Sequence, residues 1–265
     1  MIDLKFGLFW SGSYFLSYLR YLTFKTLRHF HPESEIQFYI SKKYNKSANK
    51  WQTESQDFKN ESESKNYIYE LADLNVDVIE VDYIGNPELC PVLQADLFRW
   101  MWMKREGGFY LDTDQIILKS FSTLPLEKEF IYCRYNEIQC GDYFPVGVLG
   151  LEKNSTISDS MLNSVIECYS PFNYNSSGPF MMRSAIKKID LSNSFNAPYY
   201  YFYPLPTSKD VSKVFSNSIN VNSDSYCLHW FGGHPLSQEF NKNFTKDFSD
   251  KSNDTISVLC RKIFR

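Results

Sequence analysis

Short apolar runs alternate with helical patterns along the first part of the chain. The runs Leu4–Trp10, Ile36–Ile40 and Val76–Val81 are rich in β-branched or aromatic residues, which predicts strands. Between the first two runs, apolar residues recur mostly at helical spacing until Pro32 stops the pattern, so we expect a helix over Ser17–Phe30. Strands that alternate with helices favour a mainly parallel sheet flanked by helices, which is the α/β class.

A second helix and a further strand are separated by two glycines. Proline suits the first turn of a helix over Pro91–Glu106, and Gly107-Gly108 ends it because glycine readily adopts positive φ. The apolar segment Phe109–Leu111 predicts a short buried strand, and we expect Gln115–Leu118 to continue it. The strand therefore delivers Asp112-Thr113-Asp114.

The second half of the chain is less regular. The polar stretch Lys42–Asn66 is interpreted as a loop or insertion and not as a domain linker. We expect strands at Phe130–Tyr135, Val146–Leu151, Tyr199–Tyr203 and Tyr226–Trp230, and helices at Ile157–Tyr169, Pro179–Ile189 and Thr255–Phe264.

Composition and net charge argue against some classes of binding partner. Aromatic residues make up 17% of the 265 residues, a high share, and aromatic rings in an exposed cleft stack on sugars and bases. The formal net charge is −3 at pH 7, so no basic face is implied and nucleic acid is not expected as a partner. An acidic protein that handles an anionic ligand needs a positive group in its site, and a divalent cation can supply it.

The cysteines and apolar segments bear on location. The six cysteines form no CxxC pair and no zinc-type spacing, which is typical of reduced thiols in a cytosolic compartment. The candidate membrane segment Phe6–Leu19 is interrupted by small polar residues, whereas a span takes about 20 apolar residues. We therefore expect a soluble protein, cytoplasmic or facing the cytoplasm, with no transmembrane segment.

Asp112 and Asp114 are the candidate catalytic residues. Side chains at i and i+2 of a strand point to the same face, and at a strand end two carboxylates can share one divalent ion. Hard oxygen ligands of this kind suit Mg²⁺ or Mn²⁺, which keep positions for water and phosphates. Such an ion stabilises a departing diphosphate as a Lewis acid. The location also fits, since ligands of open α/β sheets bind at the carboxyl ends of strands.

The surroundings strengthen this interpretation, because Asp-x-Asp alone is common in solvated loops. Three large apolar residues precede the pair, so a buried strand aims it. Asp96 and Arg99, at i and i+3, share one face of the preceding helix. A local salt bridge on a solvated face is the simpler explanation, but their neighbours are apolar: Leu93, Leu97, Trp100 and Met103.

The segment Ala95–Ser120, ADLFRWMWMKREGGFYLDTDQIILKS, resembles the signature of the DXD sugar-binding-region glycosyltransferases. The pattern of small-Asp-x-x-Arg, a spacer and Gly-Gly-x-Tyr-x-Asp-x-Asp is matched at each key position. That group includes initiation-type mannosyltransferases, α-1,4-galactosyl- and N-acetylglucosaminyltransferases and capsular-polysaccharide enzymes. Three shorter segments are also similar to the family: Phe9-Trp10-Ser11-Gly12, Ser177-Gly178-Pro179 and Cys227-Leu228-His229-Trp230.

The resemblance implies a single GT-A-type catalytic domain over residues 1–265, with a nucleotide-binding half at 1–120 and an acceptor-side half at 121–265. It implies that Asp114 binds a Mn²⁺ or Mg²⁺ ion directly and that Asp112 contacts ribose or sugar and the water shell of the metal. His229 is implied as a metal or diphosphate ligand. The donor-binding residues that it implies are Phe9, Trp10 (on the base), Ser11, Asp96, Arg99, Tyr110, Asp112 and Gly178.

The resemblance also implies the reaction. A hexose or N-acetylhexosamine would pass from a nucleotide sugar, with UDP favoured and GDP-mannose open, to a glycan, lipid or protein acceptor. The family members concerned retain the anomeric configuration, and the sequence shows no well-placed carboxylate for a covalent nucleophile. Front-face substitution is therefore expected, in which the leaving phosphate draws the proton of the acceptor.

Two other functions are weighed against this one. A haloacid-dehalogenase-like phosphatase also uses Asp-x-Asp, but after its first strand and normally with Thr or Val two residues on, where this chain has Ile116. A catalytically degenerate module that binds nucleotide sugar or carbohydrate is the alternative function, because His234 stands where relatives commonly carry Ser-Trp. His29 and His31 are expected to be structural and not metal ligands.

Overall fold

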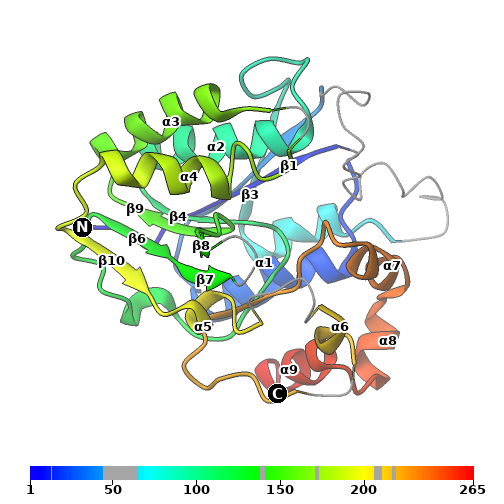
Figure 1. Cartoon of the computed structure of the whole chain (residues 1–265). Helices are drawn as coiled ribbons and strands as arrows, with labels where there is room; N and C mark the ends of the chain where they lie inside the picture. The colour runs from blue at the N-terminus through cyan, green and yellow to red at the C-terminus, as the bar shows by residue number, and fades with distance from the viewer. Residues whose placement is uncertain (13, 44–64, 138–140, 171–172, 206–210, 217–218) are drawn as a thin grey trace.

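A seven-stranded sheet runs through the centre of the computed structural model, which describes residues 1–12, 14–43, 65–137, 141–170, 173–205, 211–216 and 219–265 (Figure 1). The strand order is β10-β6-β9-β4-β1-β2-β3. The strands span Phe6–Ser11 (β1), Ile36–Ser41 (β2), Val76–Val81 (β3), Gly108–Leu111 (β4), Phe130–Cys133 (β6), Val148–Leu151 (β9) and Ser194–Ala197 (β10). β9 runs antiparallel to β4 and β6, and the other four pairings are parallel. The predicted mainly parallel α/β sheet is therefore confirmed.

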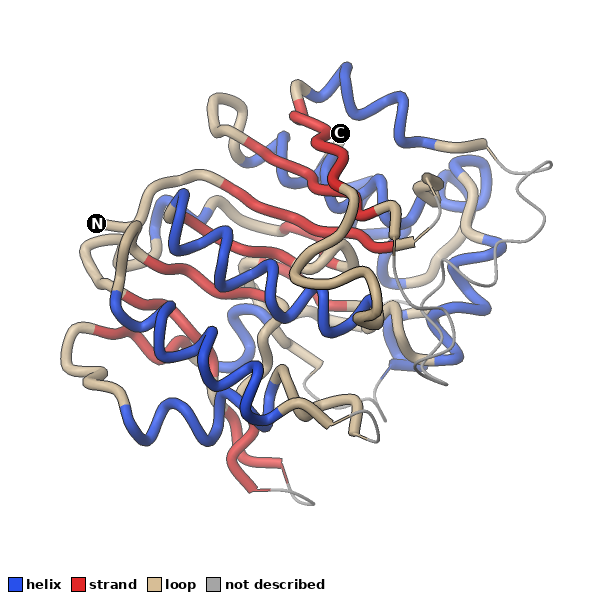
Figure 2. Tube along the Cα trace, turned by 90° about the horizontal axis from the view of Figure 1, so that it is seen from above, coloured by secondary structure: helices blue, strands red, loops and turns tan. Residues whose placement is uncertain are grey.

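Helices cover both faces of this sheet. One layer contains α2 (Pro91–Glu106), α3 (Thr156–Cys168) and α4 (Pro179–Ala185), which pack side by side. The other contains α1 (Tyr18–Phe30), the 3-10 helix η2 (Tyr67–Leu74) and α9 (Thr255–Ile263) (Figure 1). From above, the long helices run alongside the strands (Figure 2). The shorter elements are η3 (Phe121–Thr123), η4 (Ile186–Lys188), α5 (Tyr199–Phe202), α6 (Val211–Val214), α7 (Pro235–Asn243) and α8 (Lys246–Lys251).

Glycines allow helix α2 and strand β4 to come close to strand β1. A Cβ atom at Gly7 of β1 would lie 2.4 Å from ring atoms of Trp102 on α2, so only glycine permits this approach. Gly107 ends α2 with a φ of 72°, and its N–H donates to Met103 O. Gly108 has a φ of 96°, and a Cβ there would lie 2.4 Å from Lys5 O. The predicted Gly-Gly boundary therefore has a steric basis on both sides.

Two small antiparallel pairs accompany the main sheet. β5 (Gln115–Ile117) pairs with β11 (Cys227–His229), and β7 (Tyr135–Glu137) pairs with β8 (Gly141–Tyr143). The expectation that Gln115–Leu118 continues the strand before it is wrong. The main-sheet strand ends at Leu111. The Asp112 N–H still donates to Gly147 O at 2.8 Å, in register with the β4–β9 pair, and the chain then enters a different sheet.

One expected element changes its type. Tyr199–Tyr203 was expected to be a strand, but the segment forms the helical turn α5, in which Tyr203 N donates to Tyr199 O at 2.7 Å. Strand propensity of aromatic residues reflects their packing on a sheet, and here the rings pack around a turn that follows Pro198. The expected helix Pro179–Ile189 is divided into α4 and η4. Residues 44–64 of the expected polar insertion lie outside the described residues.

Two observations bear on the expected location. In the part of the chain that the structure describes, no helix is long and apolar enough to cross a bilayer. Cys90, Cys133, Cys168, Cys227 and Cys260 are free thiols.

Candidate active site

The Asp112-Thr113-Asp114 turn stands at the carboxyl end of β4 and is fixed by its backbone. Asp112 N donates to Gly147 O at 2.8 Å, and Thr23 Oγ1 donates to Thr113 O at 2.8 Å. Asp114 O accepts from Trp230 N at 3.0 Å. Gly147 precedes β9, Thr23 lies on α1, and Trp230 follows β11. Three separate parts of the fold therefore set the direction of the two carboxylates.

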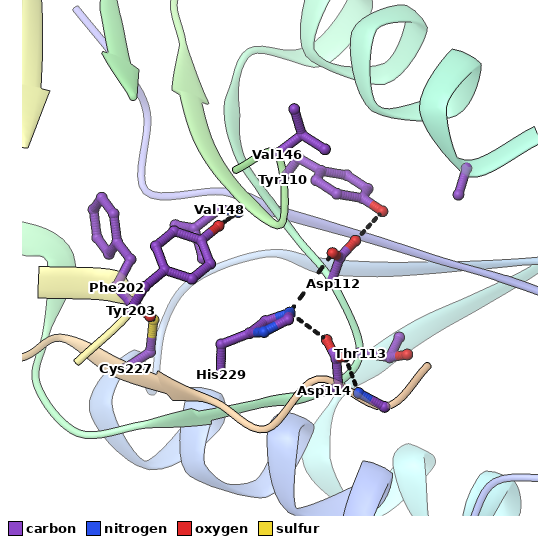
Figure 3. Close-up of polar contacts among 12 residues, drawn as sticks. Tyr110, Asp112, Thr113, Asp114, Val146, Val148, Phe202, Tyr203, Cys227 and His229 are labelled. Atoms are coloured by element: carbon purple, nitrogen blue, oxygen red, sulfur yellow. Dashed lines mark hydrogen bonds and ion pairs between the residues drawn. The ribbon is translucent and has the colours of Figure 1, made fainter. Parts of the chain in front are cut away.

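His229 joins the two carboxylates from the far end of the chain (Figure 3). Its Nε2 lies 3.1 Å from Asp114 Oδ1 and 3.9 Å from Asp112 Oδ2. One ligand atom from each of the three residues falls within 4.8 Å of the others. The β5–β11 pairing brings them together, because it sets His229 opposite Gln115, the residue that follows Asp114.

Burial and charge set the ionisation of this cluster. Burial alone would raise the pKa of Asp114, but the His229 imidazole, the Arg20 guanidinium and the Gly232 N–H hold it well below its usual range. Burial raises the pKa of Asp112, with the Asp114 carboxylate adding to the rise and Arg99 opposing it. Burial would lower the pKa of His229, yet the two carboxylates raise it above its ordinary value. The cluster therefore concentrates negative charge and attracts cations.

The donor set fits a hard divalent cation. Two carboxylates and one imidazole converge on one point, and Asp114 is 8% and His229 8% exposed. Oxygen ligands of this kind suit Mg²⁺ and Mn²⁺, and Mn²⁺ accepts an imidazole nitrogen more readily than Mg²⁺ does. Three protein ligands leave room for waters and for oxygen atoms of a diphosphate. The residues present therefore fit a site for a divalent metal ion.

A second group of side chains supports Asp112 from α2. Arg99 Nη2 lies 2.9 Å from Asp96 Oδ1 and 3.9 Å from Asp112 Oδ1. Its guanidinium stands 4.6 Å from the centroid of the Tyr110 ring, and the Tyr110 hydroxyl donates to Asp112 Oδ1 at 2.8 Å. Asp96 also accepts a 2.5 Å bond from the hydroxyl of Ser177. The buried salt bridge thus holds one positive group directly beside the acidic turn.

A cleft opens over the acidic turn. Phe9, Trp10 and Ser11 of β1 form one wall, and Pro91, Val92, Ala95 and Arg99 of α2 form another; the remaining lining residues are Arg20, Tyr110, Asp112, Thr113, Asp114, Tyr174, Gly232 and Gly233. Seven of the predicted site residues therefore line one cavity. Asp96 and Gly178 lie behind it, since Asp96 is 2% exposed and a Cβ at Gly178 would lie 3.3 Å from its Oδ1.

Arg20 is a site residue that the sequence did not reveal. It donates to Thr113 Oγ1, and its guanidinium lies 4.4 Å from the Trp10 ring centroid and 5.2 Å from that of Trp230. It is 7% exposed and lines the cleft. An arginine in the first turn of an amphipathic helix normally suggests a surface position, so no signal in the sequence pointed to this role.

Two glycines of the site were also not predicted. Gly232 N donates to Asp114 Oδ2 at 2.6 Å, and a Cβ there would lie 2.6 Å from Arg20 Nη2. A Cβ at Gly147 would lie 2.6 Å from Asp112 Oδ2 and 3.3 Å from His229 Nε2. Both positions are crowded because backbone passes directly beside the carboxylates.

The other histidines have structural contacts. His31 is 3% exposed, and its Nε2 accepts from Phe121 N at 3.2 Å. The ring of His29 packs edge-on against Phe30 and Phe264. His234 caps α7, where its Nδ1 accepts from Leu236 N at 3.2 Å.

Comparison with known proteins connects this geometry to a family. Residues 22–131 match the family model described as glycosyltransferase sugar-binding region containing DXD motif. None of the curated proteins matches the chain. The matched segment holds most of α1, all of α2 and β4, and the acidic turn, so the predicted resemblance to the DXD glycosyltransferases is confirmed.

Solved glycosyltransferases share the fold. The PaToxG glycosyltransferase is 18% identical with a TM-score of 0.51, over 71% of this chain and 69% of that one. GlyE of Streptococcus pneumoniae TIGR4 is 14% identical with a TM-score of 0.51, over 99% of this chain and 61% of that one. The chain therefore spans about three fifths of the length of GlyE. The GT-A fold predicted for the chain is confirmed.

Proposed function

We propose that this glycosyltransferase transfers a hexose or N-acetylhexosamine from a UDP-sugar, with Mn²⁺ bound by Asp112, Asp114 and His229. The observation that carries the proposal is the convergence of these three ligand atoms within 4.8 Å, in a cleft walled by Trp10 and Arg99. The acceptor is a glycan, a lipid-linked sugar or a protein.

The cation, when bound, supplies a Lewis acid that neutralises the diphosphate. The chain itself supplies further positive charge on the same side of the cleft. Arg20 projects from α1 toward Thr113 and the acidic turn, and Gly233 lines the cleft beside it. These groups would hold the diphosphate oxygens in place while the sugar bond breaks.

The remaining residues bind the base and the sugar. One face of the Trp10 ring is covered by the Arg20 guanidinium, so the base meets the remaining face or edge of the ring, next to Phe9 and Ser11. Ser11 Oγ is buried and makes no hydrogen bond to another described residue, which leaves it for the donor. Arg99 binds the donor sugar, while Asp96 holds Arg99 from behind and Gly178 leaves room for the Asp96 carboxylate. Tyr110 orients Asp112 through its hydroxyl.

The acids of the cleft bear on how a retaining transfer would proceed. Among the described residues that line it, the carboxylates are Asp112 and Asp114, and both face His229. No lining carboxylate is therefore left to act as a covalent nucleophile. In the proposed step the acceptor hydroxyl attacks the anomeric carbon on the face that the diphosphate leaves. The bond from that carbon to the phosphate oxygen breaks, and this oxygen takes the proton of the acceptor.

The two halves of the chain would contribute different parts of the site. Residues 1–120 contribute the base and diphosphate contacts, and residues 121–265 complete the metal site through His229 and shape the acceptor side. The free thiols agree with a cytoplasmic location, which is part of the proposal.

A ligand panel tests the proposal and separates it from a degenerate binding module. UDP- and GDP-sugars are added with and without Mn²⁺, and the melting temperature and the release of free sugar are measured. We expect a Mn²⁺-dependent rise in melting temperature with a UDP-sugar, together with slow hydrolysis of that sugar. Stabilisation without any turnover would support the module, and a response to none of the nucleotides would contradict both.

A further inference from the structure

Gln115 is a buried polar residue that belongs neither to the ligand cluster nor to the lining of the cleft. Its side chain is 0% exposed, and neither Oε1 nor Nε2 has a hydrogen-bond partner among the described residues. Buried amide groups are nearly always hydrogen-bonded, because leaving them unpaired is costly. The position of Gln115 in the fold therefore requires an explanation, and its neighbour across the β5–β11 pair supplies one.

The register of this pair sets Gln115 directly opposite His229. Trp230 N donates to Asp114 O at 3.0 Å, and Leu118 N donates to Tyr226 O at 2.8 Å, so these are hydrogen-bonded positions of the ladder. Pairs alternate along an antiparallel ladder, which makes Gln115 and His229 a non-hydrogen-bonded pair. In such pairs the Cα atoms lie about 4.5 Å apart and the side chains approach most closely on one face.

The imidazole of His229 has one nitrogen engaged and one available. Nε2 faces the carboxylates of Asp112 and Asp114. Nδ1 is buried and, like the amide of Gln115, has no hydrogen-bond partner among the described residues. A histidine that binds a metal through one nitrogen normally donates its other N–H to an acceptor, which fixes the tautomer and the orientation of the ring. Gln115 offers such an acceptor on the same face of the pair.

We propose that Gln115 is the positioning residue of His229. Through one buried water, its Oε1 accepts the Nδ1–H of the imidazole in the metal-bound protein and keeps the Nε2 lone pair directed at the acidic turn. A bridging water finds three polar atoms here, namely both amide atoms and Nδ1, and that number is typical for a buried water. The inference rests on the proposed metal site, because it explains how the third ligand is held.

Metal affinity tests the inference without any assay of sugar transfer. Gln115→Met removes both polar atoms and keeps the length of the side chain, whereas Gln115→Glu keeps an acceptor oxygen. Binding of Mn²⁺ is followed by electron paramagnetic resonance of the free ion. Loss of such an outer-shell partner typically weakens metal binding 10–100-fold. We expect a loss of about that size for the Met variant and no loss for the Glu variant, whose carboxylate still accepts the Nδ1–H.

A matched control lies two residues along the same strand. Ile117 is 0% exposed, faces the same side as Gln115 and pairs with Cys227. Ile117→Met should bind Mn²⁺ as the unaltered protein does. If Gln115→Met bound Mn²⁺ normally, or if both Met variants lost the same affinity, Gln115 would have no positioning role.

The Nδ1 proton of His229 gives a second test with the diamagnetic ion Mg²⁺ bound. The chain has four histidines, and His229→Gln identifies the signals of the fourth in nitrogen-15 spectra. We expect this proton to exchange with water more slowly in the unaltered protein than in Gln115→Met. Equal exchange rates in the two proteins would overturn the inference. Failure of the unaltered protein to bind Mn²⁺ or Mg²⁺ would instead contradict the proposed function.

Discussion

The backbone N–H of Gly232 donates to Oδ2 of Asp114 at 2.6 Å, while Oδ1 of the same carboxylate faces His229 Nε2 at 3.1 Å. One oxygen of Asp114 is thus held by the turn that follows β11, and the other is directed at the ligand cluster. The turn is sharp, since Phe231 adopts a φ of 52° and His234 N donates to Phe231 O. The orientation of Asp114 therefore depends on the backbone just before α7.

Gly232→Ala tests this dependence. A Cβ would lie 2.6 Å from Arg20 Nη2 and 3.2 Å from Asp114 Oδ2, so either the guanidinium or the carboxylate must move. We expect Mn²⁺ and UDP affinity to fall by about tenfold, which is about 1.4 kcal/mol of binding free energy. Isothermal titration calorimetry measures both. Gly233→Ala is the control for crowding, because it keeps the backbone N–H that lines the cleft and, among the described residues, its Cβ would have the Tyr174 hydroxyl nearby at 3.5 Å. Equal losses in the two variants would show that the crowding at Gly232 is not the cause.

Removal of the Asp114 carboxylate should abolish the rise in melting temperature that Mn²⁺ causes. In Asp114→Ala the cluster loses one of its three ligands, and we expect Mn²⁺ to cause little or no rise in melting temperature with a UDP-sugar. Turnover should fall at least 100-fold, and a chelator should reduce the unaltered protein to the same level. Differential scanning fluorimetry and a coupled assay of free UDP provide the two measurements. A variant that kept the full metal-dependent shift would refute the assignment of Asp114.

Arg20 should act on the diphosphate and not only on the fold. Arg20→Lys keeps a positive charge but loses the planar group that lies over Trp10 and reaches Thr113 Oγ1. We expect UDP to bind about tenfold more weakly while uridine, which carries no phosphate, binds about as before. A comparison of the two dissociation constants separates the effects. A parallel loss of uridine affinity would assign Arg20 to the shape of the Trp10 wall.

Acid should destabilise the protein through His31. Burial, with a smaller contribution from the nearby Arg28, lowers the pKa of His31 to about 4. The folded-state pKa lies below that of the unfolded chain, so between about pH 6.5 and 4 the unfolded chain binds a proton that the folded chain does not. Stability is then fully present above this window and falls as the pH drops, by at most about 1.4 kcal/mol per pH unit.

Urea unfolding at pH 7.5, 6 and 5 measures this slope. His31→Gln should be less stable than the unaltered protein at pH 7.5, because it disturbs the contacts with Phe6 and Phe121. Its free energy of unfolding should nevertheless depend less on pH. His29→Gln, at an exposed position, should keep the original slope. An unchanged slope in His31→Gln would place the acid-sensitive group elsewhere.

Local patterns predicted the first half of the fold because each of its elements is sequence-local. The apolar run of β1, the proline at the start of α2 and the two glycines before β4 each specify their own conformation. The acidic turn was predicted for the same reason. The β5–β11 pair could not be predicted in this way, since its strands are three residues each and more than a hundred positions apart.

The unpredicted site residues share that cause. Arg20 is buried because Trp10, Trp230 and Thr113 surround it, and these come from three separate segments. Gly147 and Gly232 matter only through their distance from carboxylates that are remote in sequence. The error at Tyr199–Tyr203 has a similar origin, because aromatic residues in a strand pattern became a helical turn around rings such as Tyr226. A single chain shows composition and spacing, but not which distant segments meet.

The ligand cluster draws its members from two segments more than a hundred residues apart, with the two aspartates after β4 and the histidine on β11. The imidazole is carried by the β5–β11 pair, which is not part of the seven-stranded sheet. A shortened chain that ended before Cys227 would keep every strand of that sheet and still lack a complete ion-binding centre. The ion-binding centre can therefore form only once β11 has been synthesised, after every strand of the main sheet.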